Sequence, residues 1–535
     1  MLETLRRMRT AGLRCFAPGC FVLGCQVLAL ASALIAVAPI VAHAKFVFAN
    51  ASPYDTLDPH VILDVGRVAS RLNLYDGLLR WQDNPAKLEP WLAQSYSVSQ
   101  DGRTYTFELR KGARFHDGSE IKAADVVYSM ERILGLKQGA YPLFSSLLAP
   151  GSTKASGDTT VEFNLIKPSA IFLAILPEVH VVNTALLKKN EINNDWGNAW
   201  LTGNDAGSGS YKLTSYDPAL GFTAERFKEH WNTKWRAKPI EEIEFRTVLD
   251  VDARVAGLIE GEFHGTDGYL PPDKIKRLRE AQNIAVADAE SLRLFYAILH
   301  NGREPMNDIN FRKALSHAFD YDGFNKGILA DQVLRNPVPL PVNLWSALKS
   351  VKGYALDLEK AREYLARMKT PPREITIAAI AGYPQTEQAA ALLQANLEKI
   401  GVKSTLVAEP WPVVMEKMRN EKQMYDVLFL WKSAYYADPN NWVGEMYDCD
   451  QVGGRNNSWY CNREVDKFLK EAVNATNPDE RRRNYEKAAV LVMEDAGGIF
   501  INNARWSGPF NKKVTGIRFC PIGDGQEMRW ASMEP

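Results

Sequence analysis

Alternation of apolar and polar residues marks the strands of this chain, and a change of period marks its helices. Residues 45–49 alternate in this way and stop in a polar turn. Residues 104–109 alternate more regularly, as a half-buried strand requires. From residue 124 the apolar positions gather on one helical face, and the same spacing predicts a helix over residues 67–80.

The second half of the chain repeats strand and helix signals in succession. Apolar strand runs alternate there with helical patterns, at 375–380, 385–400, 403–407, 411–418 and 425–431. This β-α-β-α-β order predicts an α/β fold, in which helices cover an open sheet. Ligands of such sheets bind beyond the carboxyl ends of the strands, so the aromatic loop LWKSAYYADPNNW at 430–442 is the first candidate site.

Length and charge narrow the class of protein. The 535 residues exceed the size at which one core saturates, so two or three packed units are expected. Lys and Arg number 64 and Asp and Glu also number 64, and the basic residues are scattered along the chain. No surface that could follow a phosphate backbone is predicted, and nucleic acid is not expected as a partner.

The first 44 residues have the features of an export signal. Arginines at the start precede a long uncharged apolar run, and small residues occupy the two positions that a signal peptidase reads before Lys45. We predict a cleaved signal peptide at 1–44 and a soluble exported protein. The alternatives are an uncleaved membrane anchor, although Pro and Gly interrupt the run, and lipidation at Cys25, whose motif is imperfect.

The cysteines fit an oxidising compartment. Three of the six lie within the first 44 residues, which leaves Cys449, Cys461 and Cys520. Cys449 and Cys461 flank a short loop and are the predicted disulfide, worth about 3 kcal/mol. Cys520 follows a strand-like segment and is expected to be a buried thiol rather than a reactive one.

Signatures of catalysis are missing from the sequence. The histidines beyond residue 44 stand far apart, no HExxH or CxxC occurs, and no Gly-Lys pair could start a Walker-type phosphate loop. We therefore predict no enzyme activity, no metal site and no cofactor. A large exported chain with aromatic residues gathered in a loop after a strand indicates ligand binding.

Six segments, in order, resemble the family 5 extracellular solute-binding proteins, which are the dipeptide, oligopeptide and nickel-binding components of ABC importers. They are EPWLAQSYSVSQDG (89–102), DGRTYTFELRKGARFHDGSEIKAADVVYSMERI (101–133), GSGSYKLTSYD (207–217), NGREPMNDINFRKALSHAFD (301–320), YDVLFLWKSAYYADPNNW (425–442) and NNSWYCNREVDKFLKEA (456–472). The resemblance covers nearly all of the chain beyond the signal. One departure is Lys122, where the family usually has a Thr or Ser helix cap; a lysine cannot accept from the helix amides, so this helix start should be weaker by about 1 kcal/mol unless another acceptor substitutes.

The resemblance implies a bilobal periplasmic-binding-protein type II fold with an inserted extra subdomain. The implied division is 45–78, 207–298 and 501–535 for lobe I, 79–206 for its inserted subdomain, and 299–500 for lobe II. Crossing segments are expected near 295–301 and 498–503, because strand-like runs end there in polar residues. Hinges at these crossings would let the lobes close over a ligand.

The resemblance also implies where the ligand lies. In peptide-binding members an aspartate shortly after the tryptophan pairs with the α-ammonium of the peptide, but the residues after Trp431 are Lys432, Ser433, Ala434, Tyr435 and Tyr436. In a first hypothesis Asp438, or another acid, holds the ammonium, and aromatic residues line the cleft. In a second, Lys432 faces a carboxylate or a sugar-like acid, and the ligand is an opine, glycoside or metal chelate.

Trp431 and one tyrosine are expected to line the cleft, because Tyr435 and Tyr436 cannot both face one way in an extended loop. Asn301 and Trp411 are further candidates. The predicted function is a periplasmic binding protein, monomeric, that delivers a small solute, in the first place a peptide, to an ABC permease of the inner membrane. An exported hydrolase, or a chaperone or receptor on the same fold, is the remaining alternative.

Overall fold

The computed structural model describes residues 45–534, except residues 236, 349, 371–373 and 476. The predicted signal peptide at 1–44, and with it the lipidation alternative at Cys25, lies outside the described residues. Within the described part of the chain, no helix combines the length and the apolar character needed to cross a membrane.

One large sheet connects most of the described strands. Its order is β15-β14-β16-β12-β17-β11-β1-β10-β9-β8, and β13 pairs with β17 beside this path. We call the part around β1 the first lobe and the part around β14 the second lobe. The first-lobe strands are β1 (Lys45–Asn50), β8 (Tyr211–Asp217), β9 (Gly221–Arg226), β10 (Glu242–Thr247) and β11 (Gly265–Thr266).

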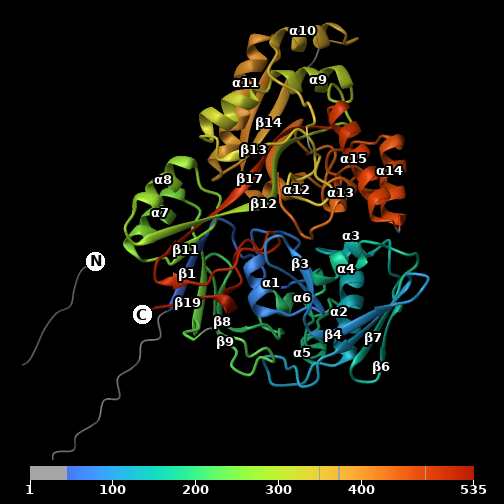
Figure 1. Cartoon of the computed structure of the whole chain (residues 1–535), viewed down its shortest axis with the longest axis vertical. Helices are drawn as coiled ribbons and strands as arrows, with labels where there is room; N and C mark the ends of the chain where they lie inside the picture. The colour runs from blue at the N-terminus through green and yellow to red at the C-terminus, as the bar shows by residue number, and fades with distance from the viewer. Residues whose placement is uncertain (1–44, 236, 349, 371–373, 476, 535) are drawn as a thin grey trace, which may run out of the picture. The chain divides into compact units, whose positions relative to one another are not determined.

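Strand β1 is buried on both of its faces. Phe46 and Phe48 point into one core, whereas Val47 and Ala49 point into another. Helices α7 (Val251–Glu260) and α8 (Pro272–Glu280) contribute to the second core and lie beside β11 (Figure 1). β1 pairs in parallel with both β10 and β11, as expected for a strand covered on both sides.

A separate antiparallel sheet, of order β4-β5-β7-β6, forms much of the segment between β1 and β8. Along β5 the buried residues Tyr105, Phe107 and Leu109 alternate with half-buried ones, which confirms the predicted half-buried strand. Helix α2 packs against this sheet. The elements of this segment are β2 (Leu79–Gln82), β3 (Lys87–Pro90), β4 (Ala93–Val98), β5 (Thr104–Leu109), α2 (Ala123–Leu136), α3 (Tyr141–Phe144), β6 (Thr153–Ser156), β7 (Thr160–Asn164), α4 (Phe172–Ile175), η1 (Leu176–Glu178), α5 (Thr184–Lys189) and α6 (Asn198–Leu201).

Other acceptors replace the missing side-chain cap at the start of α2. The Lys122 side chain accepts no hydrogen bond, as expected for an ammonium group. The amide of Ala123 instead donates to the Asp158 carbonyl at 2.8 Å, and the Lys122 amide donates to the Asp125 carboxylate at 2.9 Å. These bonds offset part of the loss expected from the lysine.

The helix predicted over 67–80 is shorter than its apolar spacing indicated. Helix α1 (Val68–Leu74) ends where Tyr75 adopts extended backbone, and Gly77 then forms an antiparallel bridge with His180. Leu78 is buried in the core of the inserted sheet, and its carbonyl accepts from the amides of the neighbouring segment at 91–93. Pairing with distant strands therefore outweighs the local helical period.

The second lobe confirms the predicted alternation of strands and helices. Its parallel strands are β14 (Ile375–Ile380), β15 (Ser404–Glu409) and β16 (Val427–Lys432). Ile377 and Phe429 point into one core and Ala378 and Leu428 into another, so this part of the sheet is also covered on both faces. The surrounding elements are α9 (Ile309–Ala318), η2 (Gly323–Ile328), β13 (Val333–Arg335), α10 (Leu358–Ala366), α11 (Pro384–Lys399) and α12 (Trp411–Lys417).

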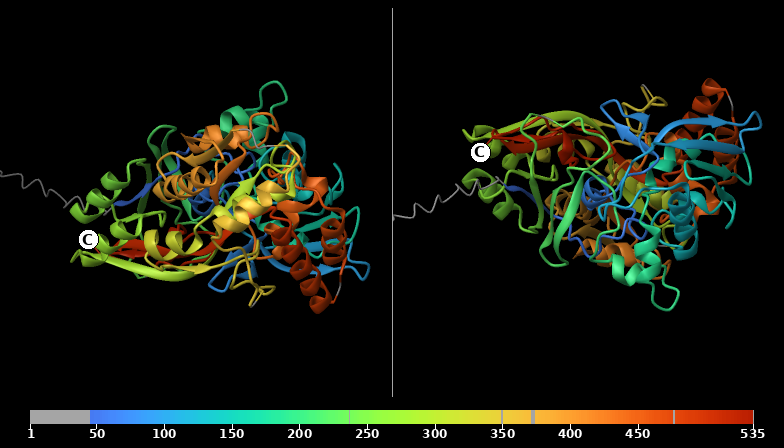
Figure 2. Two further views of the ribbon diagram at one scale, coloured as in Figure 1. Left: turned by 90° about the horizontal axis from the view of Figure 1, so that it is seen from above. Right: turned by 90° about the horizontal axis from the view of Figure 1, so that it is seen from below.

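Two long antiparallel strands, β12 (Ile284–Leu299) and β17 (Gly498–Asn511), join the lobes. The pair is visible as a green and a red ribbon that run together in both views of Figure 2. The last residues of β12, from Leu294, pair also with β16 of the second lobe, and the end of β17 pairs with β11 of the first. Their register shifts between Glu290 and Arg293, just before the predicted crossing at 295–301.

The disulfide predicted from the sequence is present. Cys449 and Cys461 are bonded, with their Cα atoms 4.7 Å apart. The bridge lies between α13 (Gly444–Tyr447) and α14 (Arg463–Asn474), and α14 packs against α15 (Pro478–Glu494). The remaining short elements are η3 (Pro439–Asn441), η4 (Cys449–Gln451), β18 (Val514–Thr515), η5 (Met528–Trp530) and β19 (Ser532–Met533).

Candidate functional site

A cavity of about 140 Å³ lies at the carboxyl end of β16 and is lined by both lobes. The first lobe contributes Ser52 and Asp64 from the long loop after β1, and Tyr269 from the loop after β11. The second lobe contributes an aromatic and a charged group of side chains. We call this cavity the inner pocket; its second-lobe residues include Tyr296, Tyr383, Trp411, Trp431, Lys432, Tyr435 and Arg455.

Aromatic rings form one wall of the inner pocket. The ring centres of Tyr269 and Trp431 are 5.3 Å apart, and both lie within 6 Å of the ring of Tyr383. Arg293 stacks its guanidinium over Tyr269 at 4.0 Å. Since Tyr269 belongs to the first lobe and the other two rings to the second, this wall joins the lobes. Its flat apolar faces can stack on planar or apolar parts of a ligand.

A charged cluster forms another wall. The buried carboxylate of Glu445 accepts two hydrogen bonds from Arg455, at 2.9 and 2.7 Å, and a long one from Lys432 at 3.4 Å. Its other oxygen accepts from the Tyr436 hydroxyl at 2.8 Å. Both cations lie over the ring of Tyr435, the lysine nitrogen 4.9 Å and the guanidinium carbon 4.8 Å from its centre.

Burial perturbs the protonation of this cluster. Burial and the neighbouring Arg455 lower the pKa of Lys432 to about 7, and Glu445 offsets only part of this effect. Although burial favours its neutral form, Glu445 keeps a pKa below its usual range because Arg455 and Lys432 favour the carboxylate. At neutral pH the lysine is therefore close to half protonated.

Asp64 provides the opposite charge in the inner pocket. It is 5% exposed, and within the described residues it is the only carboxylate that lines this cavity. Its side chain accepts from the Nε of Arg67 at 2.9 Å and from the Arg67 amide at 3.3 Å. The inner pocket thus combines one carboxylate from the first lobe with two cations from the second, separated by aromatic surface.

Comparison with known proteins identifies the family. The model of the bacterial extracellular solute-binding proteins, family 5, matches residues 87–454. The chain belongs to this family. This confirms the resemblance noted in the sequence, and the chain is therefore a solute-binding protein of the class that serves ABC importers.

Relatives of this solute-binding protein cover nearly its whole length. It is 28% identical over 501 residues to the "Probable D,D-dipeptide-binding periplasmic protein DdpA" of Escherichia coli, covering 90% of this chain and 94% of that one. It is 26% identical over 504 residues to heme-binding protein A of Haemophilus influenzae, covering 89% and 90%. The solved periplasmic binding protein DppA of Helicobacter pylori, in complex with the peptide STSA, superposes with a TM-score of 0.84 at 23% identity, covering 92% of this chain and 98% of that one. This likeness confirms the predicted bilobal type II fold.

The structure brings four of the predicted site residues together. Trp411, Trp431, Lys432 and Tyr435 of this solute-binding protein all line the inner pocket. Trp431 does so because β16 keeps its alternation to the end: Leu428 and Leu430 face one core, and Phe429 and Trp431 pack on the opposite side.

Tyr436 faces away from the inner pocket. It is fully buried in the core of the inserted sheet of the first lobe, although its own loop follows β16 of the second lobe. Its hydroxyl accepts from the Asn440 side chain at 3.0 Å and donates to Glu445. The prediction that the two neighbouring tyrosines point in opposite directions agrees with this geometry, and Tyr436 ties the two lobes together.

Asp438 does not line the inner pocket either. Its carboxylate accepts two hydrogen bonds from Arg481, at 2.6 and 2.9 Å, and also accepts from the Asn440 amide at the start of η3. Arg481 lies 43 residues further along the chain, on α15. Asp438 as the ammonium anchor stays a prediction, which this geometry does not favour, because the residue lies outside the lining of the inner pocket and its carboxylate is paired with Arg481.

Asn301 is a structural residue in this geometry. Its amide nitrogen donates to the backbone carbonyls of Leu299, Ser458 and Gly497, at 2.7 to 3.2 Å. These contacts fasten the end of β12 to the start of β17. Asn301 is not among the residues that line the inner pocket.

Sequence reasoning missed the residues that come from other segments. Asp64, Tyr269 and Arg455 carry no motif, and they reach the inner pocket only through the fold. Ser52 and Tyr383 could have been found, because each closely follows the carboxyl end of a strand, β1 or β14, in the same sheet. If the rule is applied to every strand rather than to β16 alone, it predicts both residues as part of the site.

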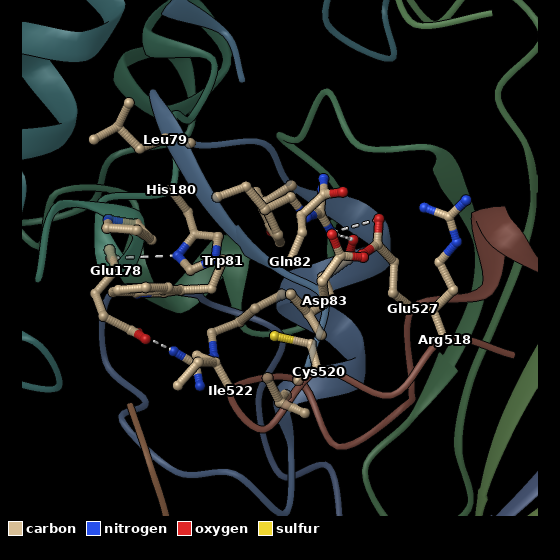
Figure 3. A pocket seen from close by; sticks show the side chains of 18 of the residues that line it. Leu79, Trp81, Gln82, Asp83, Glu178, His180, Arg518, Cys520, Ile522 and Glu527 are labelled. Atoms are coloured by element: carbon tan, nitrogen blue, oxygen red, sulfur yellow. Dashed lines mark hydrogen bonds and ion pairs between the residues drawn. The ribbon is translucent and has the colours of Figure 1, made fainter. Parts of the chain in front are cut away.

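A second cavity, of about 60 Å³, lies between α1, β2 and the segment around Cys520 and shares no lining residue with the inner pocket (Figure 3). Ion pairs join four of its charged groups, Arg71 with Glu178 and Arg80 with Glu527 at 3.2 Å, and Asp83 and Arg518 also line it. Cys520 is half-buried, and burial raises its pKa to about 12, so the thiol stays protonated at neutral pH. This cavity offers no charge contrast comparable to that of the inner pocket.

Proposed function

We propose that this solute-binding protein acts in the periplasm, captures a short peptide in the inner pocket and delivers it to an ABC permease in the inner membrane. The observation that carries the proposal is the inner pocket itself, which has walls from both lobes and opposite charges on them. Export would use the predicted signal peptide at 1–44, cleaved before Lys45. The protein would act as a monomer, without a cofactor or a catalytic step.

A peptide fits the charges of the inner pocket. A zwitterionic peptide presents an ammonium group at one end and a carboxylate at the other, and each must be paired once water is excluded. Asp64 is the acid placed to receive the ammonium, in the role that the first hypothesis gave to Asp438 or another acid. Lys432 and Arg455 face the other end, and the rings of Trp431 and Tyr269 offer stacking surface to a side chain.

Lobe closure would use the long strands that cross between the lobes. The register of β12 and β17 shifts between Glu290 and Arg293 and again between Phe295 and Tyr296, and a bulge bends a strand locally. We place the hinge across these two shifts, the second of which falls within the predicted 295–301, and keep the predicted division into two lobes and an inserted subdomain. Closure would bury the cargo in the inner pocket, against the wall that contains Tyr269 and Trp431, and create the surface that the permease recognises.

A non-peptide acid is the second candidate cargo. Lys432 and Arg455 share Glu445 as their one direct counter-ion, so their wall of the inner pocket can receive a further anion, such as a carboxylate of an opine, a sugar acid or a chelate. The heme-binding name of one relative supports the idea that this family accepts cargo other than peptides. An exported hydrolase or a chaperone has no comparable support from the site.

The deciding experiment is to identify the cargo directly. The full chain is expressed with its own signal, the exported protein is purified without dialysis and denatured, and the released small molecules are identified by mass spectrometry. Peptides with free amino termini are expected. Asp64→Asn should then abolish their retention, whereas the isosteric Asp438→Asn should not. Release of a sugar acid or an opine would mean that the cargo is the second candidate and not a peptide. Turnover of any peptide or glycoside would refute the binding role.

A further inference from the structure

The charged wall of the inner pocket holds two cations against one carboxylate. Glu445 is buried in the described structure and Lys432 and Arg455 are half-buried, with side-chain exposures of 5%, 12% and 18%. The Oε2 atom of Glu445 already accepts two hydrogen bonds from Arg455, which explains why Lys432 reaches it only at 3.4 Å. A buried cluster with one excess positive charge is costly unless a further counter-ion arrives or a proton leaves.

The other charged groups near Lys432 are committed elsewhere. Asp64, on the loop after β1, is paired with Arg67. Glu178, at the end of η1, influences the charges of this cluster but is itself paired with Arg71. Tyr435, on the loop after β16, stays protonated because burial raises its pKa. None of these groups supplies the missing negative charge.

We propose that the cargo carries a carboxylate that docks between Lys432 and Arg455 as the second counter-ion of this cluster, and that the fraction of Lys432 that is neutral takes up a proton as the cargo binds. The inference deepens the proposed function and rests on it in one respect, namely that the inner pocket holds the cargo. The carboxylate arrives ionised, and the proton moves from solvent to the neutral amine of Lys432. No bond other than this N–H bond is made or broken.

The protonation of Lys432 fixes the expected pH dependence. Its pKa of about 7 without a counter-ion means that about one tenth of the lysines are neutral at pH 6 and about nine tenths at pH 8. A bound carboxylate favours the charged form of Lys432 and raises this pKa. The fraction of Lys432 that is neutral before binding therefore takes up a proton when the cargo binds. Affinity should fall about tenfold for each pH unit above 7 and change little below pH 6.

The test is titration calorimetry of the mature protein at pH 6 and pH 8, in buffers of different ionisation enthalpy. Three probes separate the charges of the cargo: the dipeptide Ala-Phe, its carboxy-terminal amide, and 3-phenylpropionate, which has the carboxylate without the ammonium. 3-Phenylpropionate should take up close to one proton at pH 8 and little at pH 6, whereas Ala-Phe should take up more at pH 8, because its own α-amino group, with an ordinary pKa of about 8, is protonated as well. The amide should bind about 10- to 100-fold more weakly and take up only the proton of its own α-amino group.

Two variants and a control isolate the lysine. Lys432→Arg keeps a permanent charge, so binding should persist at pH 8 while proton uptake by 3-phenylpropionate disappears. Lys432→Met should weaken Ala-Phe about tenfold or more at pH 6 and remove the pH dependence of 3-phenylpropionate binding. Lys417→Met is the control: this lysine lies on α12 and pairs with Glu409 at 2.6 Å, away from the lining of the inner pocket, and its loss should change neither quantity.

The outcomes separate this inference from the proposed function. Equal affinity and equal proton uptake for Ala-Phe and its amide would overturn the inference and leave peptide binding intact. Binding and proton uptake by 3-phenylpropionate alone would support the inference and refute the peptide as cargo. Failure of all three probes to bind would overturn both.

Discussion

Replacing Asp438 by Asn tests whether this residue stabilises the fold or binds the cargo. Asp438 is 6% exposed, and its carboxylate is held by a pair of hydrogen bonds from Arg481. Although burial opposes its charge, Asp438 raises the pKa of Arg481 above the ordinary value. The isosteric Asp438→Asn removes the negative charge but keeps an oxygen that can accept from the Asn440 amide, as the aspartate does at 3.0 Å. The substitution therefore isolates the ion pair.

Breaking a buried pair from one side costs about 3–5 kcal/mol, because the remaining charge stays desolvated. Arg481 retains a hydrogen bond to the Ala472 carbonyl at 3.2 Å, and its guanidinium lies 5.3 Å from the ring centres of both Trp345 and Tyr485. These contacts stabilise the unpaired cation in part. We expect the free energy of unfolding to fall by about 3 kcal/mol, the lower end of this range.

The assay is urea unfolding followed by tryptophan fluorescence, with cargo affinity measured in parallel by calorimetry. Affinity should stay within about twofold, and the double variant Asp438→Asn/Arg481→Met should lose less stability than the sum of the two single variants. Asp450→Asn is the matched control, since its pair with Lys470 is exposed and should contribute under about 1 kcal/mol. A large loss of affinity with unchanged stability would refute the assignment and return Asp438 to the binding site.

Three further results are expected. Replacing Cys449 and Cys461 by Ser should lower the unfolding free energy by about 3 kcal/mol, since the bridge closes a loop of sequence separation 12; reductant should affect only the parent protein. Burial lowers the pKa of His60 to about 4, so stability should fall as the pH drops from 6.5 towards 4, by about 3 kcal/mol from this group, and the slope should flatten in His60→Gln. Asp58→Asn should cost about 3–5 kcal/mol in urea unfolding at pH 7, because Asp58 and Arg132 form a fully buried ion pair, and a loss below about 1 kcal/mol would contradict this.

The parts of the fold that could be predicted from the sequence are those fixed by local pattern. Strand β5 follows from strict alternation, and the second lobe follows from strand and helix runs in succession. The disulfide follows from two cysteines with a short loop between them. The helix over 67–80 was wrong in its second half, because residues 75–80 pair with segments distant in the sequence, and no local pattern contains that information.

The candidate site was predictable only where its residues follow a strand end. Trp431, Lys432 and Tyr435 do so, and they line the inner pocket. Asp438 follows the same strand, but an arginine 43 residues away pairs with it, and charge pairing over such a distance is invisible in one sequence. Asp64 reaches the inner pocket from the first lobe. Its position there depends on the tertiary fold and not on any motif near it in the sequence.

Adjacent residues of the loop after β16 have two different roles, and this explains why the loop contains both aromatic and charged side chains. Tyr435 lines the inner pocket beside Lys432 and Arg455, whereas Tyr436 enters the core of the first lobe. Glu445 connects these roles, since one of its oxygens accepts from Tyr436 and the other from both cations. A cargo carboxylate that shares the cations with Glu445 would change the hydrogen bonds of the same group that holds the interlobe tyrosine. We infer that recognition of cargo charge and contact between the lobes meet at this single carboxylate.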